Sequence, residues 1–227
     1  MISIDGGAMS LKPKCEGGCW NGCKLCCIGE SCCFNYYHLK EGTTTGDVTI
    51  APTLLGEIAY HEIDSEKTQL KMTPKGFLAA DQTVDLECKC LSCGEFCASG
   101  RCCALLATGH GKVFMNTFGS IAKYELPPGA SFKVDNGFVM GWEWNPDLRM
   151  SFGLAADSLK DSCFSGEVFA SILTNNSDKP VYIFVQTRQV SKFAKKLARY
   201  MGNPTAWLAG RGGGGGANGG GGGGGGQ

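Results

Sequence analysis

Hydrophobic and polar residues alternate in short runs along most of the chain, and turn-forming sequences separate one run from the next. The alternation fills residues 32–87 and returns in 102–154, where Pro127-Pro128-Gly129 and Asp135-Asn136-Gly137 have the composition of hairpin turns. A period of two is typical of half-buried β-strands. No strand–helix–strand rhythm is present, which argues against a parallel doubly wound sheet. We therefore predict an all-β fold.

A second pattern is a repeat in the middle of the chain. Gly-x-Ile-Ala occurs at residues 56–59 and at 119–122, and a Gly-Phe pair follows each copy, at Gly76-Phe77 and Gly137-Phe138. The copies are offset by roughly 60 residues, which indicates a duplicated β module. The repeat predicts stacked, β-helix-like barrel or sandwich modules, and it does not by itself predict chemistry.

A weaker similarity indicates a third, incomplete unit. Gly29, Gly100 and Gly166 each open a hydrophobic run, and residues 181–185 have the pattern of a further strand. We expect the incomplete unit to be the last one, because a helical segment follows it directly.

These patterns divide the chain into four regions. The first two are β modules, each with a cysteine-rich loop, and the last two are a basic amphipathic helix and a glycine-rich tail. In chain order, the regions are residues 1–91 with the loop 15–33, residues 92–188 with the loop 88–103, residues 189–202 and residues 203–227.

Residues 189–201 have a clear helical periodicity. Lysine and arginine occupy most of the helix surface, and the apolar side chains recur on one face, at Val190, Phe193, Ala194, Leu197 and Met201. One interpretation is that the apolar face packs on the β modules. The other, less favoured interpretation is that the basic helix contacts anionic lipid at a membrane surface, or an acidic partner.

The tail is nearly all glycine from Gly210 onward, so it has almost no side chains to bury. Such a segment is a flexible tail or linker, or its backbone groups find partners in neighbouring subunits. In the second interpretation Trp207 and Leu208 anchor the tail, and Phe193 and Leu197 are further assembly candidates.

Composition limits the classes of function. Lys+Arg and Asp+Glu both number 21, and the pI is about 6.8. A neutral chain without a basic-aromatic strand pattern argues against a nucleic-acid partner. No apolar stretch of about 18 residues is present. The first residues have neither the basic and apolar regions of a signal peptide nor an arginine-rich transit pattern.

The 14 cysteines form two dense clusters and one outlier. An even number, close spacing and few histidines favour disulfides, and therefore an extracellular or other oxidising compartment. Zinc is an alternative, because Cys23-x-x-Cys26 and Cys90-x-x-Cys93 each resemble half of a zinc site, and buried thiols are a third. The missing signal peptide favours a cytoplasmic or mitochondrial compartment instead. The disulfide candidates are Cys15, Cys19, Cys23, Cys26, Cys27, Cys32, Cys33, Cys88, Cys90, Cys93, Cys97, Cys102, Cys103 and Cys163.

Motifs for catalysis are missing from the sequence, which has no Walker A, nucleophile elbow or HExxH. His61 lies beside Glu62, but its repeat equivalent is Tyr124, which favours a position on the strand surface over a catalytic base. Trp142 and Trp144 share one strand face, where core or interface packing is a simpler interpretation than a stacking platform. We expect a non-enzymatic protein without cofactor or metal.

Asn175-Asn176-Ser177 is an N-glycosylation sequon in a predicted loop between two strands. If the chain passes through a secretory route, Asn175 is expected to be an exposed acceptor. An unmodified Asn175 in such material would argue against exposure or against that route.

Several short segments follow one another in an order that is informative, although none of them is specific alone. They are Gly6–Ser10, Cys27–Ser31, Gly76–Ala79, Phe118–Ile121, Leu126–Gly129, Val134–Val139, Phe164–Glu167 and Val185–Arg188. In this order they resemble the altered-inheritance-of-mitochondria 24-type family, which has a tryptophan RNA-binding attenuator protein-like fold. The resemblance implies a duplicated β-helix-like barrel that forms symmetric oligomers, and no established enzyme activity. The cysteine loops and the tail are not family features.

Three functional hypotheses follow. The leading one is a structural or scaffold protein that self-assembles into a homo-oligomer or filament, stabilised by disulfides and the glycine-rich tail. The alternative is an intracellular family member that supports mitochondrial or membrane-complex organisation, with the basic helix as its contact. The second alternative is a metal- or redox-responsive cysteine module.

Truncation after Gly202 tests the role of the tail. If residues 203–227 hold subunits together, the truncated protein is expected to have a smaller mass per particle than the full chain in light scattering. An unchanged mass would show that the tail takes no part in assembly.

Overall fold

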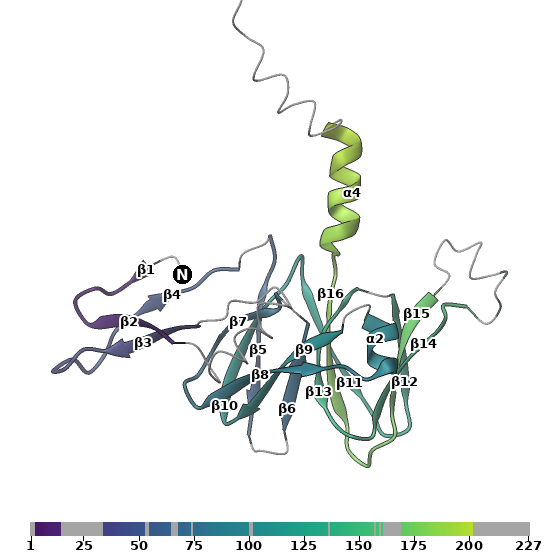
Figure 1. Cartoon of the computed structure of the whole chain (residues 1–227), viewed down its shortest axis with the longest axis horizontal. Coiled ribbons are helices and arrows are strands. Elements are labelled where there is room, and N and C mark those ends of the chain that lie inside the picture. Colours follow the sequence, from purple (N-terminus) through teal and green to yellow (C-terminus); the bar gives the residue numbers. More distant parts are fainter. Residues whose placement is uncertain are drawn as a thin grey trace, which may run out of the picture. The chain divides into compact units, whose positions relative to one another are not determined.

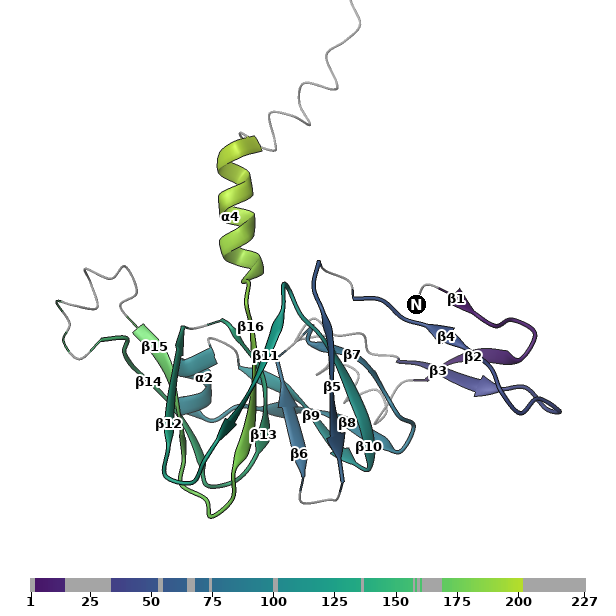
Figure 2. The same cartoon turned by 180° about the vertical axis from the view of Figure 1, so that it is seen from behind.

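The computed structural model describes residues 3–14, 34–52, 55–64, 68–73, 75–99, 102–135, 137–156, 158, 160 and 169–201. The chain divides into two units, Met1–Gln189 and Val190–Gln227. Strands dominate the described part of the first unit (Figures 1 and 2), so the prediction of an all-β fold is confirmed.

The strands form three successive sets. The first set is β1 (Ser3–Ile4), β2 (Met9–Lys14), β3 (Phe34–Leu39) and β4 (Val48–Thr49). The second is β5 (Ile58–Ile63), β6 (Gln69–Met72), β7 (Phe77–Ala80), β8 (Val84–Cys90), β9 (Cys103–Gly109) and β10 (Gly111–Asn116). The third is β11 (Ile121–Leu126), β12 (Ser131–Asp135), β13 (Val139–Trp144), β14 (Leu148–Leu154), β15 (Phe169–Asn175) and β16 (Val181–Gln186). The helices are α2 (Cys93–Ser99) and α4 (Val190–Met201).

The second and third sets have the same strand pairing, which confirms the duplication. We name the six strands of each set a to f in chain order. In both sets strand f pairs with a and c, in the orders β5-β10-β7 and β11-β16-β13. Strand e pairs with b and d, in the orders β6-β9-β8 and β12-β15-β14. All of these pairs are antiparallel.

The first set is the incomplete one. Its pairs β1·β4 and β2·β3 correspond to c·f and d·e, and the described residues hold no counterpart of strands a and b. The prediction took Gly29, Gly100 and Gly166 as the starts of units and placed the incomplete unit last, because a helical segment follows it directly. Each of them instead precedes a strand e, so the sequence similarity marks the middle of a unit.

One connection in each set contains the cysteine clusters. The segment between strands d and e, here called the d–e connection, comprises residues 15–33, 91–102 and 155–168 in the three sets. Helix α2 belongs to the second of these. The predicted module boundary at residue 91 followed the cysteines. In the structure, the second set ends at Asn116 and the third begins at Ile121.

Among the described residues, backbone strand pairing joins the second set to the third at two places. Strand β6 pairs with β13, with Lys71 opposite Trp142, and this pairing merges strands from both sets into the sheet β11-β16-β13-β6-β9-β8. At the second contact, the glycines of the two Gly-x-Ile-Ala motifs, Gly56 and Gly119, form a parallel bridge. Because the two motifs occupy equivalent places, the repeat also supplies the joint between its copies.

Gly56 is required at this bridge by the closeness of the other backbone. A Cβ atom at this position would lie 1.9 Å from the carbonyl oxygen of Thr117. The carboxylate of the next residue, Glu57, accepts hydrogen bonds from the hydroxyl of Ser120 at 3.0 Å and the backbone N–H of Ile121 at 3.2 Å. The side chain of Glu57 therefore fixes the start of β11.

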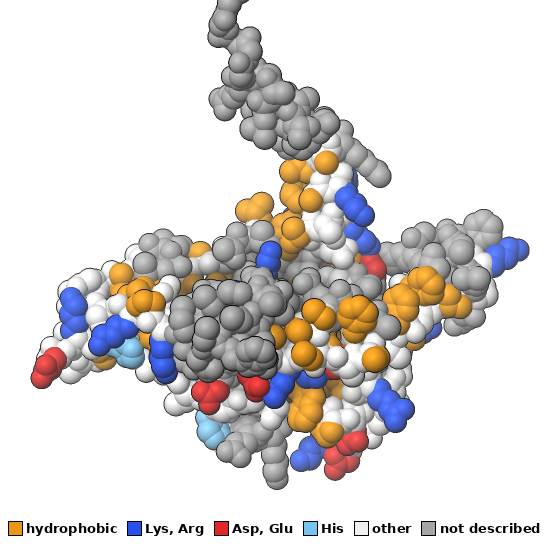
Figure 3. All heavy atoms as spheres, viewed as in Figure 1, with side chains coloured by type: hydrophobic (Ala, Val, Ile, Leu, Met, Phe, Trp, Pro, Cys, Tyr) orange, Lys and Arg blue, Asp and Glu red, His pale blue; other side chains and the backbone are white. Residues whose placement is uncertain are grey.

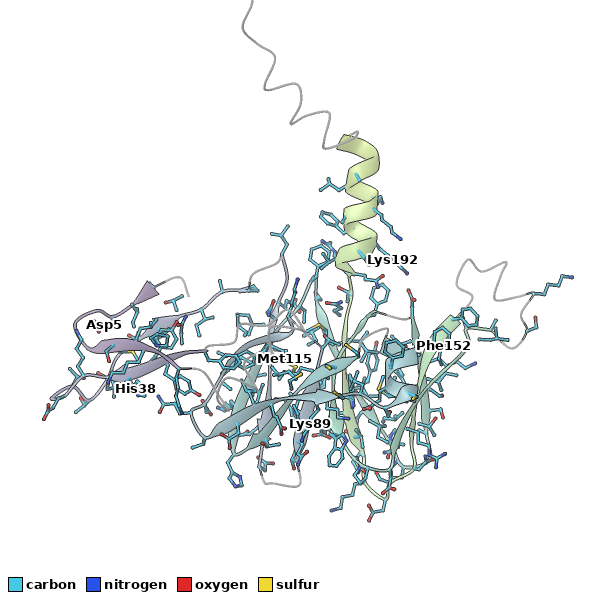
Figure 4. All side chains as sticks on the ribbon, in the orientation of Figure 1. Asp5, His38, Lys89, Met115, Phe152 and Lys192 are labelled. Atoms are coloured by element: carbon cyan, nitrogen blue, oxygen red, sulfur yellow. The ribbon has the colours of Figure 1, made fainter. Side chains whose placement is uncertain are left out.

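The core consists of two clusters of buried apolar side chains. One centres on the second set and includes Leu70, Leu105 and Met115; Figure 4 labels Met115 among the strands of this set. The other centres on the third set and includes Trp142 and Leu173. The alternating burial along these strands is the packing that the period-two pattern predicts.

Helix α4 in the second unit confirms the predicted amphipathic helix. Figure 3 shows hydrophobic side chains along one side of the helix and lysine side chains along another. Val190, Phe193 and Leu197 are each more than 40% exposed. The predicted tail, residues 203–227, lies outside the described residues.

Replacing Gly56 with alanine is expected to lower the free energy of unfolding by about 3 kcal/mol, since the new Cβ meets a backbone carbonyl that cannot rotate away. Urea denaturation measures the loss. Gly6→Ala is the matched control, because nothing lies within 4 Å of a Cβ at Gly6. Equal stability of the two variants would contradict the close approach.

Candidate functional site

A buried polar cluster lies where the second and third sets meet. His61 of β5 points inward and is 6% exposed, and its Nε2 atom lies 2.9 Å from Oε1 of Glu143 on β13. The second oxygen of Glu143 accepts the backbone N–H of Tyr182 on β16 at 3.0 Å. The cluster therefore connects strands of two sheets and of both sets.

His61 is not on the strand surface, so that prediction is wrong. The equivalence with Tyr124 gave the wrong expectation, because Tyr124 is exposed on β11 while His61 is buried on β5 and faces the neighbouring sheet. The rings of Tyr182 and Phe184 lie 6.1 and 5.3 Å from the imidazole, between ring centres. Nε2 approaches Glu143 without hydrogen-bond alignment, so the contact is a close approach of two polar side chains.

The cluster extends outward along β16. The hydroxyl of Tyr182 donates to Oε2 of Glu125 at 3.3 Å, and Nζ of Lys123 lies 3.9 Å from the centre of the Tyr182 ring. The negative charge of Glu125, followed by its hydrogen bond with the hydroxyl, raises the pKa of Tyr182. Because a protonated phenol donates to one carboxylate, this arrangement orients side chains and offers no activated nucleophile.

A second polar contact fastens α2. Nζ of Lys71 lies 2.6 Å from Oε1 of Glu95, and the two side chains are 9% and 14% exposed. The hydroxyl and backbone N–H of Ser92 donate to the other oxygen of Glu95, a capping box at the start of α2. Burial acts to raise the pKa of Glu95, but hydrogen bonds from Lys71 and Ser92 outweigh it and the pKa is lowered.

Helix α2 lies against the third set. A Cβ at Gly94 would be 2.4 Å from the carbonyl oxygen of Met150 on β14, so the helix backbone and the strand are close. Lys71 belongs to β6, and its Nζ also lies 5.8 Å from the Trp144 ring centre. Trp142 is buried in the core and Trp144 is 37% exposed, which agrees with packing rather than with a paired stacking platform.

The structure places five predicted disulfide candidates and shows them as thiols. They are Cys88, Cys90, Cys93, Cys102 and Cys103. Sγ of Cys90 and Sγ of Cys103 are 3.8 Å apart across strands β8 and β9. The described residues contain no group of three or more side chains arranged to hold a metal ion. The side chain of Cys97 and the cysteines at 15, 19, 23, 26, 27, 32, 33 and 163 lie outside the described part, so their pairing stays a prediction.

Asn175 is not an exposed acceptor, so that prediction is wrong. The residue is fully buried, and its amide nitrogen donates to the carbonyl oxygens of Leu126 and Lys179 at 2.9 and 2.7 Å. Its side-chain oxygen accepts from the backbone N–H and the hydroxyl of Ser177. The sequon is thus an Asx turn that closes the loop between β15 and β16.

The assembly candidates fall in two parts of the chain. Phe193 and Leu197 are on the apolar face of α4, both partly exposed. Trp207 and Leu208 lie outside the described residues. Within the part that the structure describes, no helix has the length and apolar character needed to cross a membrane.

Comparison with known proteins assigns the chain to a family. The family model for Mitochondrial biogenesis AIM24 matches residues 1–187, which include all three strand sets. The chain belongs to the AIM24 family. The resemblance seen in the short sequence segments is therefore confirmed, and α4 follows directly after the part shared with the AIM24 family.

A solved structure has a similar fold. The crystal structure of a Streptococcus pyogenes protein has a TM-score of 0.61 and 24% sequence identity, and the match covers 88% of this chain and 85% of that one. At this identity the likeness shows the fold alone. No curated protein matches the chain.

The AIM24 family description names mitochondrial biogenesis. This link agrees with the mitochondrial alternative for the compartment and gives no support to an extracellular one. The likeness to the tryptophan RNA-binding attenuator protein-like fold stays a prediction.

Lys71→Met is expected to lower the free energy of unfolding by about 2 to 4 kcal/mol at pH 7, because Glu95 then stays buried without its cation. The pKa of Glu95 is lowered in the folded protein, so the pair stabilises the protein above the unfolded pKa of about 4.3. That stabilisation is lost as the pH falls through the folded pKa. Urea denaturation of both proteins at several pH values should show their difference shrinking below about pH 4.

Lys89→Met is the matched control for this measurement. Lys89 contacts Glu87 at 3.0 Å, but both side chains are about half exposed. An exposed pair contributes little, so this variant should unfold like the parent protein. A similar loss in both variants would argue against the special role of the Lys71–Glu95 pair.

Proposed function

We propose that this AIM24-family chain is a non-enzymatic protein that supports the organisation of a mitochondrial membrane complex, and that α4 attaches it to the membrane surface. The observation that carries the proposal is the distribution of charge and apolar area on α4. The family assignment supplies the mitochondrial setting, and the described side chains supply the means of attachment.

Helix α4 has the properties of a surface-binding helix. Its twelve residues include Lys192, Lys195, Lys196 and Arg199 and no acidic residue. The apolar residues Val190, Phe193 and Leu197 recur at a spacing of three and four, so they share one face. Each is more than 40% exposed. A cationic helix with an exposed apolar face binds anionic bilayers by inserting that face between headgroups while the cations meet the lipid charges.

The β unit suits a scaffold role rather than a catalytic one. Two of its buried polar contacts, His61–Glu143 and Lys71–Glu95, each connect different sheets or elements. In both contacts the carboxylate also accepts backbone or side-chain hydrogen bonds from a further residue. Such groups are committed to holding strands and helix in place.

Self-assembly into a homo-oligomer is a second candidate function. Strand β12 is the equivalent of β6, and β6 pairs with the next strand set through β13. Strand β12 instead ends its sheet, β12-β15-β14. Edge strands favour pairing with another chain, so a second copy of this protein is a natural partner for β12. The disulfide and tail contributions to such an assembly rest on residues outside the described part.

Vesicle co-sedimentation tests the membrane proposal. The full chain is expected to bind vesicles of phosphatidylcholine with a third phosphatidylglycerol, and to bind vesicles of phosphatidylcholine alone at least about tenfold more weakly, because each cation near an anionic surface contributes about 1 kcal/mol. Replacing Lys192, Lys195 and Lys196 with glutamine should remove most of the binding to the anionic vesicles.

A matched control replaces three lysines of the β unit, Lys112, Lys133 and Lys179, with glutamine. This variant has the same net charge as the α4 variant, so it should keep the binding if α4 is the contact. Equal loss in both variants would show that attraction is due to total charge. Binding that survives the α4 substitutions would overturn the proposal.

A further inference from the structure

Two cysteines close the ladder between β8 and β9. Cys90 is the last residue of β8 and Cys103 is the first residue of β9, and they are directly opposite each other in the register. Their Sγ atoms are 3.8 Å apart. Cys90 is exposed and Cys103 is half-buried. The pair spans the base of the d–e connection that contains α2.

The backbone at this position fits a disulfide. Directly opposed residues in antiparallel strands have Cα atoms about 4.5 to 5.5 Å apart. A disulfide needs Cα atoms about 4.4 to 6.8 Å apart. Rotation of the two side chains is therefore enough to bring the sulfurs into bonding distance, without moving either strand.

The third strand set shows that folding alone does not require cysteines here. The equivalent closing pair of β14 and β15 is Leu154 opposite Phe169, two apolar residues. An apolar pair is compatible with the same position in the ladder. Packing alone therefore does not explain the thiols at Cys90 and Cys103.

We propose that Cys90 and Cys103 are a reversible dithiol–disulfide pair, oxidised by a low-molecular-weight disulfide such as oxidised glutathione, and that the bridge fastens α2. The bridge would close residues 91–102 into a loop. Helix α2 within this loop already contacts Met150 through Gly94 and Lys71 through Glu95. Oxidation thus strengthens the attachment of α2 to both strand sets.

The reaction proceeds by two thiol–disulfide exchanges. The exposed Cys90 thiolate attacks one sulfur of oxidised glutathione, which forms a mixed disulfide and releases one glutathione thiolate. Cys103 then loses its proton and attacks the Cys90 sulfur, which releases the second glutathione. Two protein thiols are oxidised and one glutathione disulfide is reduced to two thiols. Burial, and then the hydrogen bond with Cys90, raise the pKa of Cys103 to about 12, so the second exchange should become faster as the pH rises.

Other described thiols are poorer partners for Cys90. Cys88 is buried two residues earlier on the same strand, opposite Leu105 rather than opposite a cysteine. Cys102 lies opposite Leu91 rather than opposite Cys90, since the backbone N–H of Leu91 donates to the carbonyl oxygen of Cys102 at 2.9 Å. Cys93 is exposed at the start of α2, one turn beyond the end of the ladder.

Mass spectrometry tests the pairing. The reduced full-length chain is treated with oxidised glutathione, the remaining thiols are alkylated, and the digest is searched for linked peptides. A peptide pair joined through Cys90 and Cys103 is expected as the main product of the described cysteines. The melting temperature should rise by about 5 to 10 °C on oxidation, because closing the loop lowers the conformational entropy of the unfolded chain. A bridge from Cys90 to any other cysteine, or none, would overturn the proposal.

Variants separate this pair from other thiols in the chain. Cys103→Ser should keep glutathione attached to Cys90 as a stable mixed disulfide and abolish the rise in melting temperature. Cys90→Ser should abolish both, and its exposed position makes a folding defect easy to exclude by circular dichroism. Cys102→Ser is the matched control and should keep the bridge and the full rise. Loss of the rise in Cys102→Ser with its retention in Cys103→Ser would overturn the assignment.

Discussion

Pairing of β6 with β13 is the interaction on which the arrangement of the β unit depends. It merges a three-stranded sheet of each set into one sheet of six strands. The two sets therefore share one continuous sheet. The pairing also sets the positions of the polar contacts. Lys71 in β6 reaches Glu95 of α2, and Glu143 in β13 reaches His61 of β5. Each polar contact thus includes a residue of a strand that the pairing has already fixed in place, which limits the entropy lost in forming the contact.

The duplication and the strand content could be predicted because both produce short-range patterns in the sequence. The Gly-x-Ile-Ala motif repeats where glycine is required, at Gly56 by the nearby backbone of Thr117 and at Gly119 by a positive φ angle. The alternation of polar and apolar residues repeats where strands bury one face. The start of each unit was harder to find. The most visible sequence features, the cysteine clusters, occupy the d–e connection, so they mark the interior of a unit. The boundary predicted at residue 91 followed them.

Side-chain environments at the candidate site could not be predicted from local sequence. His61 and Tyr124 have equivalent places in the repeat, yet only His61 is buried at the junction of the two sets, while Tyr124 contacts Phe132 within its own set. Asn175 belongs to a sequon whose residues suggested exposure. The turn it forms needs its amide to satisfy the carbonyl groups of Leu126 and Lys179, and Leu126 is distant in sequence. Both outcomes depend on which strand lies opposite, and this information is absent from a window of neighbouring residues.

The recurring position of the d–e connection has a consequence for how this fold changes length. Turns between the other described strands of the complete sets are short. The d–e connection is longer and comprises residues 91–102 in the second set, 155–168 in the third and 15–33 in the first. Both flanking strands are held by full ladders, so added residues there need not disturb the pairing. The connection is thus the natural place for evolutionary insertions and for an engineered epitope or reporter peptide in the first and third sets, because α2 in the second set is already fastened to β6 and packed on β14.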